Sequence, residues 1–131
     1  MNDPAHFVTT LEARRFPGTR KRQLLSPLSF YSAEYDETIT AAPGFVFDGV
    51  SGPTLRGDGE ASSGIHDWMY AHPQIYPRDK ADKIFKECLK AEGMGWFRRN
   101  AWYSALRLFG CLYYGKEDHA SPDSTDYYGG A

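Results

Sequence analysis

The sequence predicts an α+β fold in which N-terminal antiparallel β-hairpins, or a small sheet, pack with a C-terminal segment of three helices. Short β-prone runs alternate with turn signals up to residue 48, and residues 62–112 carry apolar residues at helical spacing. The chain has 131 residues, a length typical of one domain, and 41% of them are hydrophobic, as in ordinary globular proteins. We therefore expect residues 1–114 to form a single domain.

The predicted strands are short and lie between turns. Residues 7–11 form the first of them, and Pro17-Gly18 is a turn signal. Residues 28–31 and 38–41 flank a polar pentapeptide, a pattern that predicts a hairpin. After a second turn at Pro43-Gly44, residues 45–47 form a brief apolar strand.

A glycine-rich connector follows the predicted strands. Five glycines fall within sixteen residues, between Gly49 and Gly64. The connector has neither the G-K-[ST] ending of a Walker loop nor the GxGxxG pattern that opens a helix after a strand. It therefore gives little support to a phosphate-binding loop.

Three helices are predicted after the connector, over residues 62–71, 78–92 and 95–112. Pro77 precedes the second helix and Gly93 ends it, as their conformational preferences favour. The second helix has one apolar face, and the third has a stripe with further leucines beside it. The apolar face of the second helix consists of Ala81, Ile84, Phe85, Cys88 and Leu89. The stripe of the third consists of Trp102, Ala105, Phe109 and Leu112, with Leu106 and Leu108 beside it.

The C-terminal residues 115–131 are acidic and rich in serine and glycine, and they show no periodicity. This composition predicts a flexible tail, or one that orders only against a partner. Its Tyr127–Tyr128 pair is a candidate docking element.

The overall charge of the chain argues against one class of function, general binding of nucleic acid. The net charge of −2 and the pI of about 6.1 exclude a strong overall attraction to nucleic acid. Basic residues nevertheless crowd one N-terminal stretch, which is either a solvated hairpin or loop, or a patch that faces phosphates or lipid headgroups. They are Arg14, Arg15, Arg20, Lys21 and Arg22.

The two cysteines, Cys88 and Cys111, lie within apolar helical patterns and are expected to be buried free thiols. There is no CxxC pattern, so zinc and dithiol redox chemistry lack support. No apolar run approaches the roughly 20 residues that span a bilayer, and no signal peptide is recognisable. We expect a cytosolic protein.

The strongest candidate site is the sequence H-D-W-M-Y, which contains His66, Asp67 and Tyr70. On a helix, His66 and Tyr70 share a face, whereas Asp67 is rotated by about 100°. Asp82 lies at the edge of the apolar face of the next helix. In an antiparallel helix pair it would reach the height of His66 and could accept a hydrogen bond from the imidazole. A histidine oriented by a carboxylate can act as a general base.

The same contact has a structural interpretation, in which a His–Asp pair only satisfies two polar groups and fixes the register of two helices. The other histidines lack metal-ligand spacing with His66. Ser51 and Ser63 are conceivable nucleophiles, but the G-x-S-x-G pattern is absent.

Three motifs in order resemble a family from phages and prophages that has no known function. They are A-P-G-F-V-F-D-G-V-S-G-P at residues 42–53, I-H-D-W-M-Y at 65–70 and R-D-K-A-D-K-I-F at 78–85. The resemblance covers about residues 25–110. It implies a phage origin, a location in the host cytoplasm or the virion, and phage structural proteins as partners.

A more distant resemblance is to phospholipase A2, which places H-D-x-C-Y on one helix and an aspartate on an antiparallel helix. It implies that His66 activates water, that Asp82 orients His66 and that Tyr70 braces the network. It further implies that Asp67 binds calcium with oxygens from the loop after Asp48. The half-cystines and the Y-G-C-Y-C-G-x-G-G loop of those enzymes are missing: Ile65 precedes His66, and Met69 replaces a cysteine.

Two functions therefore follow from the sequence. The first is a phage-encoded His–Asp hydrolase that resembles phospholipase A2, acts on a lipid ester at a membrane surface and uses calcium, with Asp48 and Ser51 shaping the loop at the site. The second is a non-catalytic virion component or host-interaction protein, in which the motifs maintain the fold. A nucleic-acid binder would rest on the N-terminal arginines alone.

Overall fold

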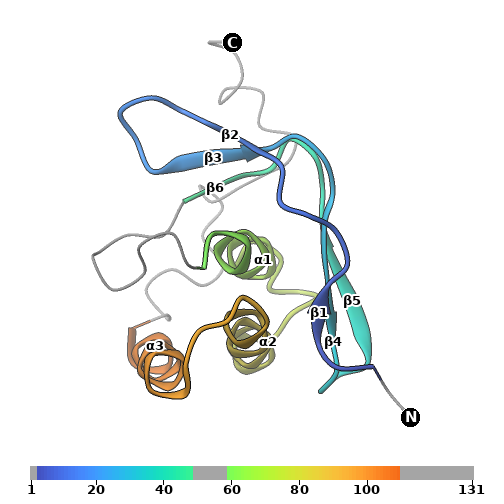
Figure 1. Cartoon of the computed structure of the whole chain (residues 1–131), viewed down its shortest axis with the longest axis vertical. Helices are drawn as coiled ribbons and strands as arrows, with labels where there is room; N and C mark the ends of the chain where they lie inside the picture. Colours follow the sequence, from blue (N-terminus) through green and yellow to red (C-terminus); the bar gives the residue numbers. More distant parts are fainter. Residues whose placement is uncertain (1–2, 49–58, 110–131) are drawn as a thin grey trace.

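The described residues form two small antiparallel sheets and three helices (Figure 1). The computed structural model describes residues 3–48 and 59–109, without the side chains of residues 106 and 109. One sheet has the order β1-β4-β5 and the other β2-β3-β6. The strands are β1 (His6–Phe7), β2 (Ala13–Arg15), β3 (Lys21–Leu24), β4 (Leu28–Ser32), β5 (Glu37–Ala41) and β6 (Val46–Asp48).

The α+β prediction is confirmed, and the predicted hairpin is β4–β5, with Phe30 opposite Ile39. The basic stretch also forms a hairpin, β2–β3, although its strands lack the aromatic residues of β4 and the β-branched residues of β5. β3 lies between β2 and β6, so pairing on both sides compensates for its low β propensity.

The helices are α1 (Glu60–Tyr70), α2 (Arg78–Ala91) and α3 (Trp96–Phe109), close to the predicted bounds. Gly59 precedes α1 with a φ of 84°, and Gly93 follows α2 with a φ of 92°, a region that favours glycine. Pro77 precedes α2 in an extended conformation, as the sequence predicts. These residues set the limits of the helix pair that carries the candidate site.

The helices form successive layers against the sheets. α1 packs against β4, β5 and β6, α2 packs against β1 and β4, and α3 lies outside them against α2 (Figure 1). The predicted apolar face of α2 is buried, including the free thiol of Cys88. The main core lies between the sheets and the first two helices.

The outer face of α3 is more exposed than the sequence predicts. Trp102 packs against the cluster of Phe85, Leu89 and Met94, but Leu108 is 71% exposed. The prediction that Leu108 lies beside a buried stripe was wrong, because α3 has a helix on one side and solvent on the other.

Several predicted features lie outside the described residues. They include most of the glycine-rich connector with Ser51, as well as Cys111 and the tail 115–131 with its tyrosine pair. Within residues 3–48 and 59–109, no helix has the length and apolar character needed to cross a membrane.

Gly64 allows α1 to approach the sheets closely. A Cβ atom at this position would lie 3.0 Å from Leu28 Cδ2 and 3.4 Å from Phe47 Cζ, and both of these side chains are buried. Gly64→Val should therefore lower the free energy of unfolding by about 1–3 kcal/mol, measured by chemical denaturation. Gly95→Ala is the matched control, because nothing lies within 4 Å of its added Cβ. Equal stability of the two variants would contradict this packing.

Candidate functional site

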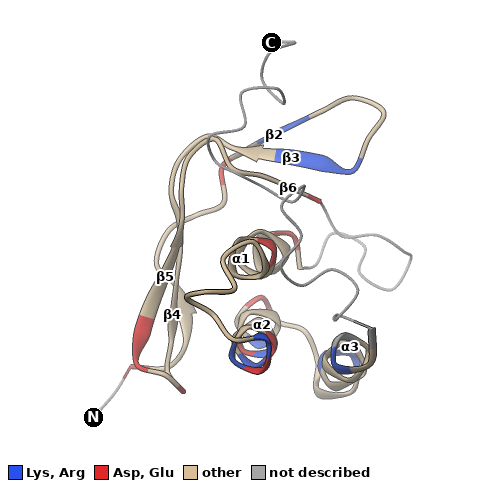
Figure 2. Ribbon diagram, turned by 180° about the vertical axis from the view of Figure 1, so that it is seen from behind, with Lys and Arg blue, Asp and Glu red and all other residues tan. Residues whose placement is uncertain are grey.

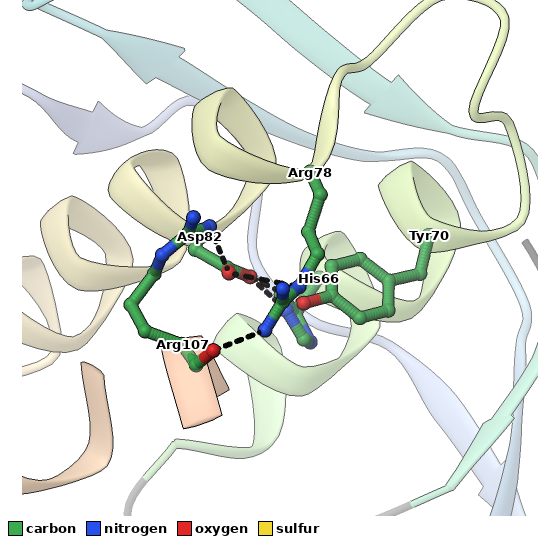
Figure 3. Close-up of polar contacts among 5 residues, drawn as sticks. All are labelled: His66, Tyr70, Arg78, Asp82 and Arg107. Atoms are coloured by element: carbon green, nitrogen blue, oxygen red, sulfur yellow. Dashed lines mark hydrogen bonds and ion pairs between the residues drawn. The ribbon is translucent and has the colours of Figure 1, made fainter. Parts of the chain in front are cut away.

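The predicted contact between His66 and Asp82 is present. Nε2 of His66 on α1 lies 3.2 Å from Oδ1 of Asp82 on α2 (Figure 3). The two residues meet because α1 and α2 pack side by side, with His66 near the end of one helix and Asp82 near the start of the next. The hydrogen bond joins the two helices inside the protein.

Asp82 is fully buried, and three further side chains contact its carboxylate. The hydroxyl of Tyr70 donates to Oδ1 at 2.5 Å, and Nη1 of Arg107 donates to Oδ2 at 3.0 Å. Nε of Arg78 lies 3.7 Å from Oδ2, and its Nη2 donates to the backbone oxygen of Arg107 at 2.7 Å (Figure 3). Both carboxylate oxygens thus have more than one partner.

These contacts determine the charge of Asp82. Burial alone would raise the pKa of this carboxyl group, but hydrogen bonds from His66, Tyr70 and Arg107 lower the pKa below its ordinary value. Burial and the hydrogen bond to Asp82 raise the pKa of Tyr70, so its hydroxyl stays protonated as a donor. Asp82 is therefore an anion at neutral pH.

The imidazole of His66 is mostly enclosed, with 10% of its side chain exposed. Its ring lies 4.1 Å from the ring of Tyr70 and 4.6 Å from that of Phe85, measured between centroids. Because an ionised Asp82 can only accept, the neutral imidazole carries its proton on Nε2 and its lone pair on Nδ1. This is the tautomer that a general base requires at Nδ1.

Asp67 points away from this cluster, toward β6. Its Oδ2 accepts a hydrogen bond from the backbone amide of Asp48 at 3.0 Å, so the expected divergence from His66 is observed. Burial raises the pKa of Asp67 to about 7, although the Asp48 amide acts in the opposite direction. The Oδ1 atom of Asp48 lies 3.5 Å from Nζ of Lys21.

The described residues supply only part of a calcium site. Calcium takes six to eight oxygen ligands, and no group of three or more His, Cys, Asp or Glu residues that could hold a metal occurs within residues 3–48 and 59–109. The carboxylates of Asp67 and Asp48 are the only predicted ligands described. The ammonium group of Lys21 beside Asp48 opposes a cation there. By themselves these residues do not fit the ion.

Sequence reasoning did not identify the two arginines of the cluster. Arg78 lies four residues before Asp82 on the same helix, in the motif R-D-K-A-D-K-I-F at residues 78–85. The i, i+4 spacing of an arginine and an aspartate could have predicted this ion pair. Arg107 gave no such signal, because it reaches Asp82 only through the packing of α3 against α2.

Comparison with protein-family models finds a match to most of this chain. A family model described as "Protein of unknown function (DUF1353)" matches residues 22–106, which include both sheets in part and most of the three helices. No curated protein and no solved structure matches the chain.

The raised pKa of Asp67 predicts a pH-dependent stability. Because the folded protein holds this proton more tightly than the unfolded chain, the contribution to stability is complete below about pH 3.8 and is lost as the pH rises through about 7. The side chain in Asp67→Asn cannot ionise, and its carbonyl oxygen can still accept the hydrogen bond from the Asp48 amide.

The free energy of unfolding of the wild type should therefore fall relative to that of Asp67→Asn between about pH 5 and pH 8, by about 1–3 kcal/mol. Urea denaturation at several pH values measures the difference. A constant difference across this range would contradict a raised pKa of Asp67.

Proposed function

We propose a hydrolase function for this chain, which belongs to DUF1353, a family of proteins of unknown function. The substrate class is a carboxylic ester of a lipid, as the resemblance of the H-D-x-x-Y motif to phospholipase A2 implies. The observation that supports the proposal is the imidazole of His66, held at Nε2 by the buried anion of Asp82. A histidine oriented in this way is a general base in many hydrolases.

In the proposed reaction, Nδ1 of His66 takes a proton from a water molecule as the water oxygen bonds to the acyl carbon of the ester. The ester C–O bond then breaks, and the leaving alcohol oxygen takes the proton back from Nδ1. The products are a carboxylic acid and an alcohol, and His66 regains its starting protonation state.

The neighbours of His66 have positioning roles in this proposal. Asp82 fixes the tautomer and the orientation of the ring, and its negative charge stabilises the imidazolium that forms during the reaction. Tyr70 holds the Oδ1 atom of Asp82 and packs against the imidazole. Arg78 and Arg107 hold Oδ2, which keeps the carboxylate from rotating.

A second function is favoured by the charge balance of the same cluster. Arg78 and Arg107 both face Oδ2, and their positive charges reduce the stabilisation that Asp82 can give to an imidazolium. His66 itself is 8% exposed. These two features suit a polar cluster that fixes the packing of three helices in a non-catalytic virion component or host-interaction protein.

A phage origin is part of both proposals. It is supported by the three motifs that resemble the phage and prophage family, and it implies expression in the host cytoplasm, with incorporation into the virion as the alternative. Phage structural proteins are the partners that a virion component would bind.

A hydrolysis assay decides between the two functions. Fatty-acid release from micelles of an ester phospholipid is measured for the wild type, His66→Gln and His72→Gln. His72 lies just after α1 and contacts Trp68, outside the Asp82 cluster, so His72→Gln is the matched control. Loss of a general base should reduce kcat by at least roughly a hundredfold in His66→Gln alone.

The melting temperature is recorded for the same three proteins. A catalytic role predicts that His66→Gln melts close to the control while turnover is lost. No turnover by the wild type with any ester, together with a clear loss of stability in His66→Gln, would exclude the hydrolase and support the packing function.

Calcium belongs to this proposal only through the resemblance, and its test is separate. If Asp67 is a ligand, millimolar calcium should raise the melting temperature of the wild type and leave that of Asp67→Asn unchanged. An unchanged melting temperature in both proteins would remove calcium from the proposal and leave the His66–Asp82 base in place.

A further inference from the structure

Positive charge is concentrated on the β2–β3 hairpin, which projects from the body of the protein (Figure 2). Arg14, Arg15 and Arg20 are exposed on it. Arg15 and Arg20, together with Thr19 and Lys21, line an open hollow at the turn of the hairpin, whose rim also includes Asp48. Several cationic side chains around one hollow would attract an anionic group.

Acidic residues neutralise only part of this charge. Lys21 pairs with Asp48, and Arg22 pairs with Glu60 on α1 at 3.4 Å. The guanidinium group of Arg14 lies over the ring of Phe16. Within the described part of the chain, Arg15 and Arg20 have no acidic partner.

The register of the hairpin adds an electrostatic cost. Arg15 lies directly opposite Arg22 on the paired strand, and like charges in opposite cross-strand positions are destabilising. Glu60 offsets part of this repulsion through its ion pair with Arg22, and an anion bound at the exposed Arg15 would offset the rest. A local unfavourable feature of this kind often accompanies a binding function.

The outer face of α3 adds exposed apolar and aromatic side chains. Trp96 is 62% exposed and Phe97 82% exposed, and Leu108 extends the same exposed helix. Arg98 is also exposed beside them. Aromatic and aliphatic side chains next to arginine are typical of helices that lie at a membrane interface.

These two surfaces lie toward the same side of the molecule. In Figures 1 and 2, the tip of the β2–β3 hairpin and α3 both lie on the side remote from β4 and β5. Because α3 also carries Arg107, which contacts Asp82, this side lies close to the candidate site. A flat partner that touches both elements would therefore lie against α3, the helix whose Arg107 contacts Asp82.

We propose that the β2–β3 hairpin and the outer face of α3 together dock this protein on an anionic lipid bilayer. The exposed Trp96 and Phe97 favour lipid over nucleic acid, since their rings would enter the headgroup region of a bilayer. The inference deepens the proposed function and rests on it for the idea that the lipid holds the substrate.

Vesicle cosedimentation tests the docking without turnover if the His66→Gln variant is used throughout. The vesicles contain phosphatidylcholine alone, or equal parts of phosphatidylcholine and phosphatidylglycerol. We expect binding to the anionic vesicles only, and its loss as sodium chloride rises from roughly 0.05 M to 0.5 M. Equal binding to both kinds of vesicle, or to neither, would overturn the proposal.

Charge reversal locates the electrostatic contact. Arg15→Glu with Arg20→Glu should lower the partition coefficient roughly 30-fold or more, because each basic residue near the surface contributes about a fivefold factor. Lys83→Glu with Lys90→Glu changes the net charge equally at exposed positions of α2 and should lower it by no more than about threefold. Similar losses in both double variants would contradict docking through the hairpin.

A second pair of variants tests α3. Phe97→Ser should lower the partition coefficient roughly tenfold, since its ring would leave the bilayer interface. Ile75→Ser is the control, because Ile75 is 55% exposed in the connection between α1 and α2. Unchanged binding of Phe97→Ser would remove α3 from the docking surface and overturn the two-element proposal.

Two further outcomes separate this inference from the proposed function. Vesicle binding by a wild-type protein that hydrolyses no ester would leave the docking surface valid and the hydrolase excluded. The second outcome is a protein that does not bind anionic vesicles but binds duplex DNA, and loses the DNA binding in Arg15→Glu with Arg20→Glu. This outcome would overturn the docking proposal, whereas the hydrolase would still be tested by its own assay.

Discussion

The arrangement of the three helices depends on the hydrogen bonds and ion pairs made by the buried carboxylate of Asp82. A charge without exposure to water is costly unless hydrogen bonds and opposite charges surround it. The side chains that meet this need come from all three helices: His66 and Tyr70 from α1, Arg78 from α2 and Arg107 from α3. The packing of the helices and the geometry of the candidate site are therefore parts of one structure.

The pKa values of the two aspartates of the site are shifted in opposite directions. Asp82 gains enough donors to overcome burial, and its pKa lies below the ordinary value. Asp67, one residue after His66, faces β6 and accepts one described backbone hydrogen bond, so burial raises its pKa to about 7. Neighbouring carboxyl groups with such different pKa values can have different roles, one as a permanent anion and the other as a group that titrates near neutrality.

Periodicity in the sequence predicts much of this arrangement. The apolar face of α2, the limits set by Pro77 and Gly93, and the equal height of His66 and Asp82 in an antiparallel pair all depend on local geometry, and the structure agrees with each. The hairpin β4–β5 likewise follows from two β-prone runs around a polar turn.

The remaining features depend on tertiary contacts that no local pattern reports. β2 and β3 consist largely of basic residues, and they form strands because β3 pairs on both sides. Arg107 becomes part of the site, and Leu108 becomes exposed, only through the orientation of α3 on α2. That orientation is set by long-range packing, so neither outcome could be predicted from the spacing of residues in α3.

The protonation state of the His66 ring tests the central claim most directly. A long-range ¹H–¹⁵N NMR spectrum of the wild-type protein, recorded at about pH 8, distinguishes a proton on Nε2 from a proton on Nδ1. A carboxylate that accepts from Nε2 at 3.2 Å predicts the Nε2-protonated ring as the dominant form. A ring protonated on Nδ1 would contradict the hydrogen bond to Asp82 and, with it, the assignment of His66 as a base oriented by that carboxylate.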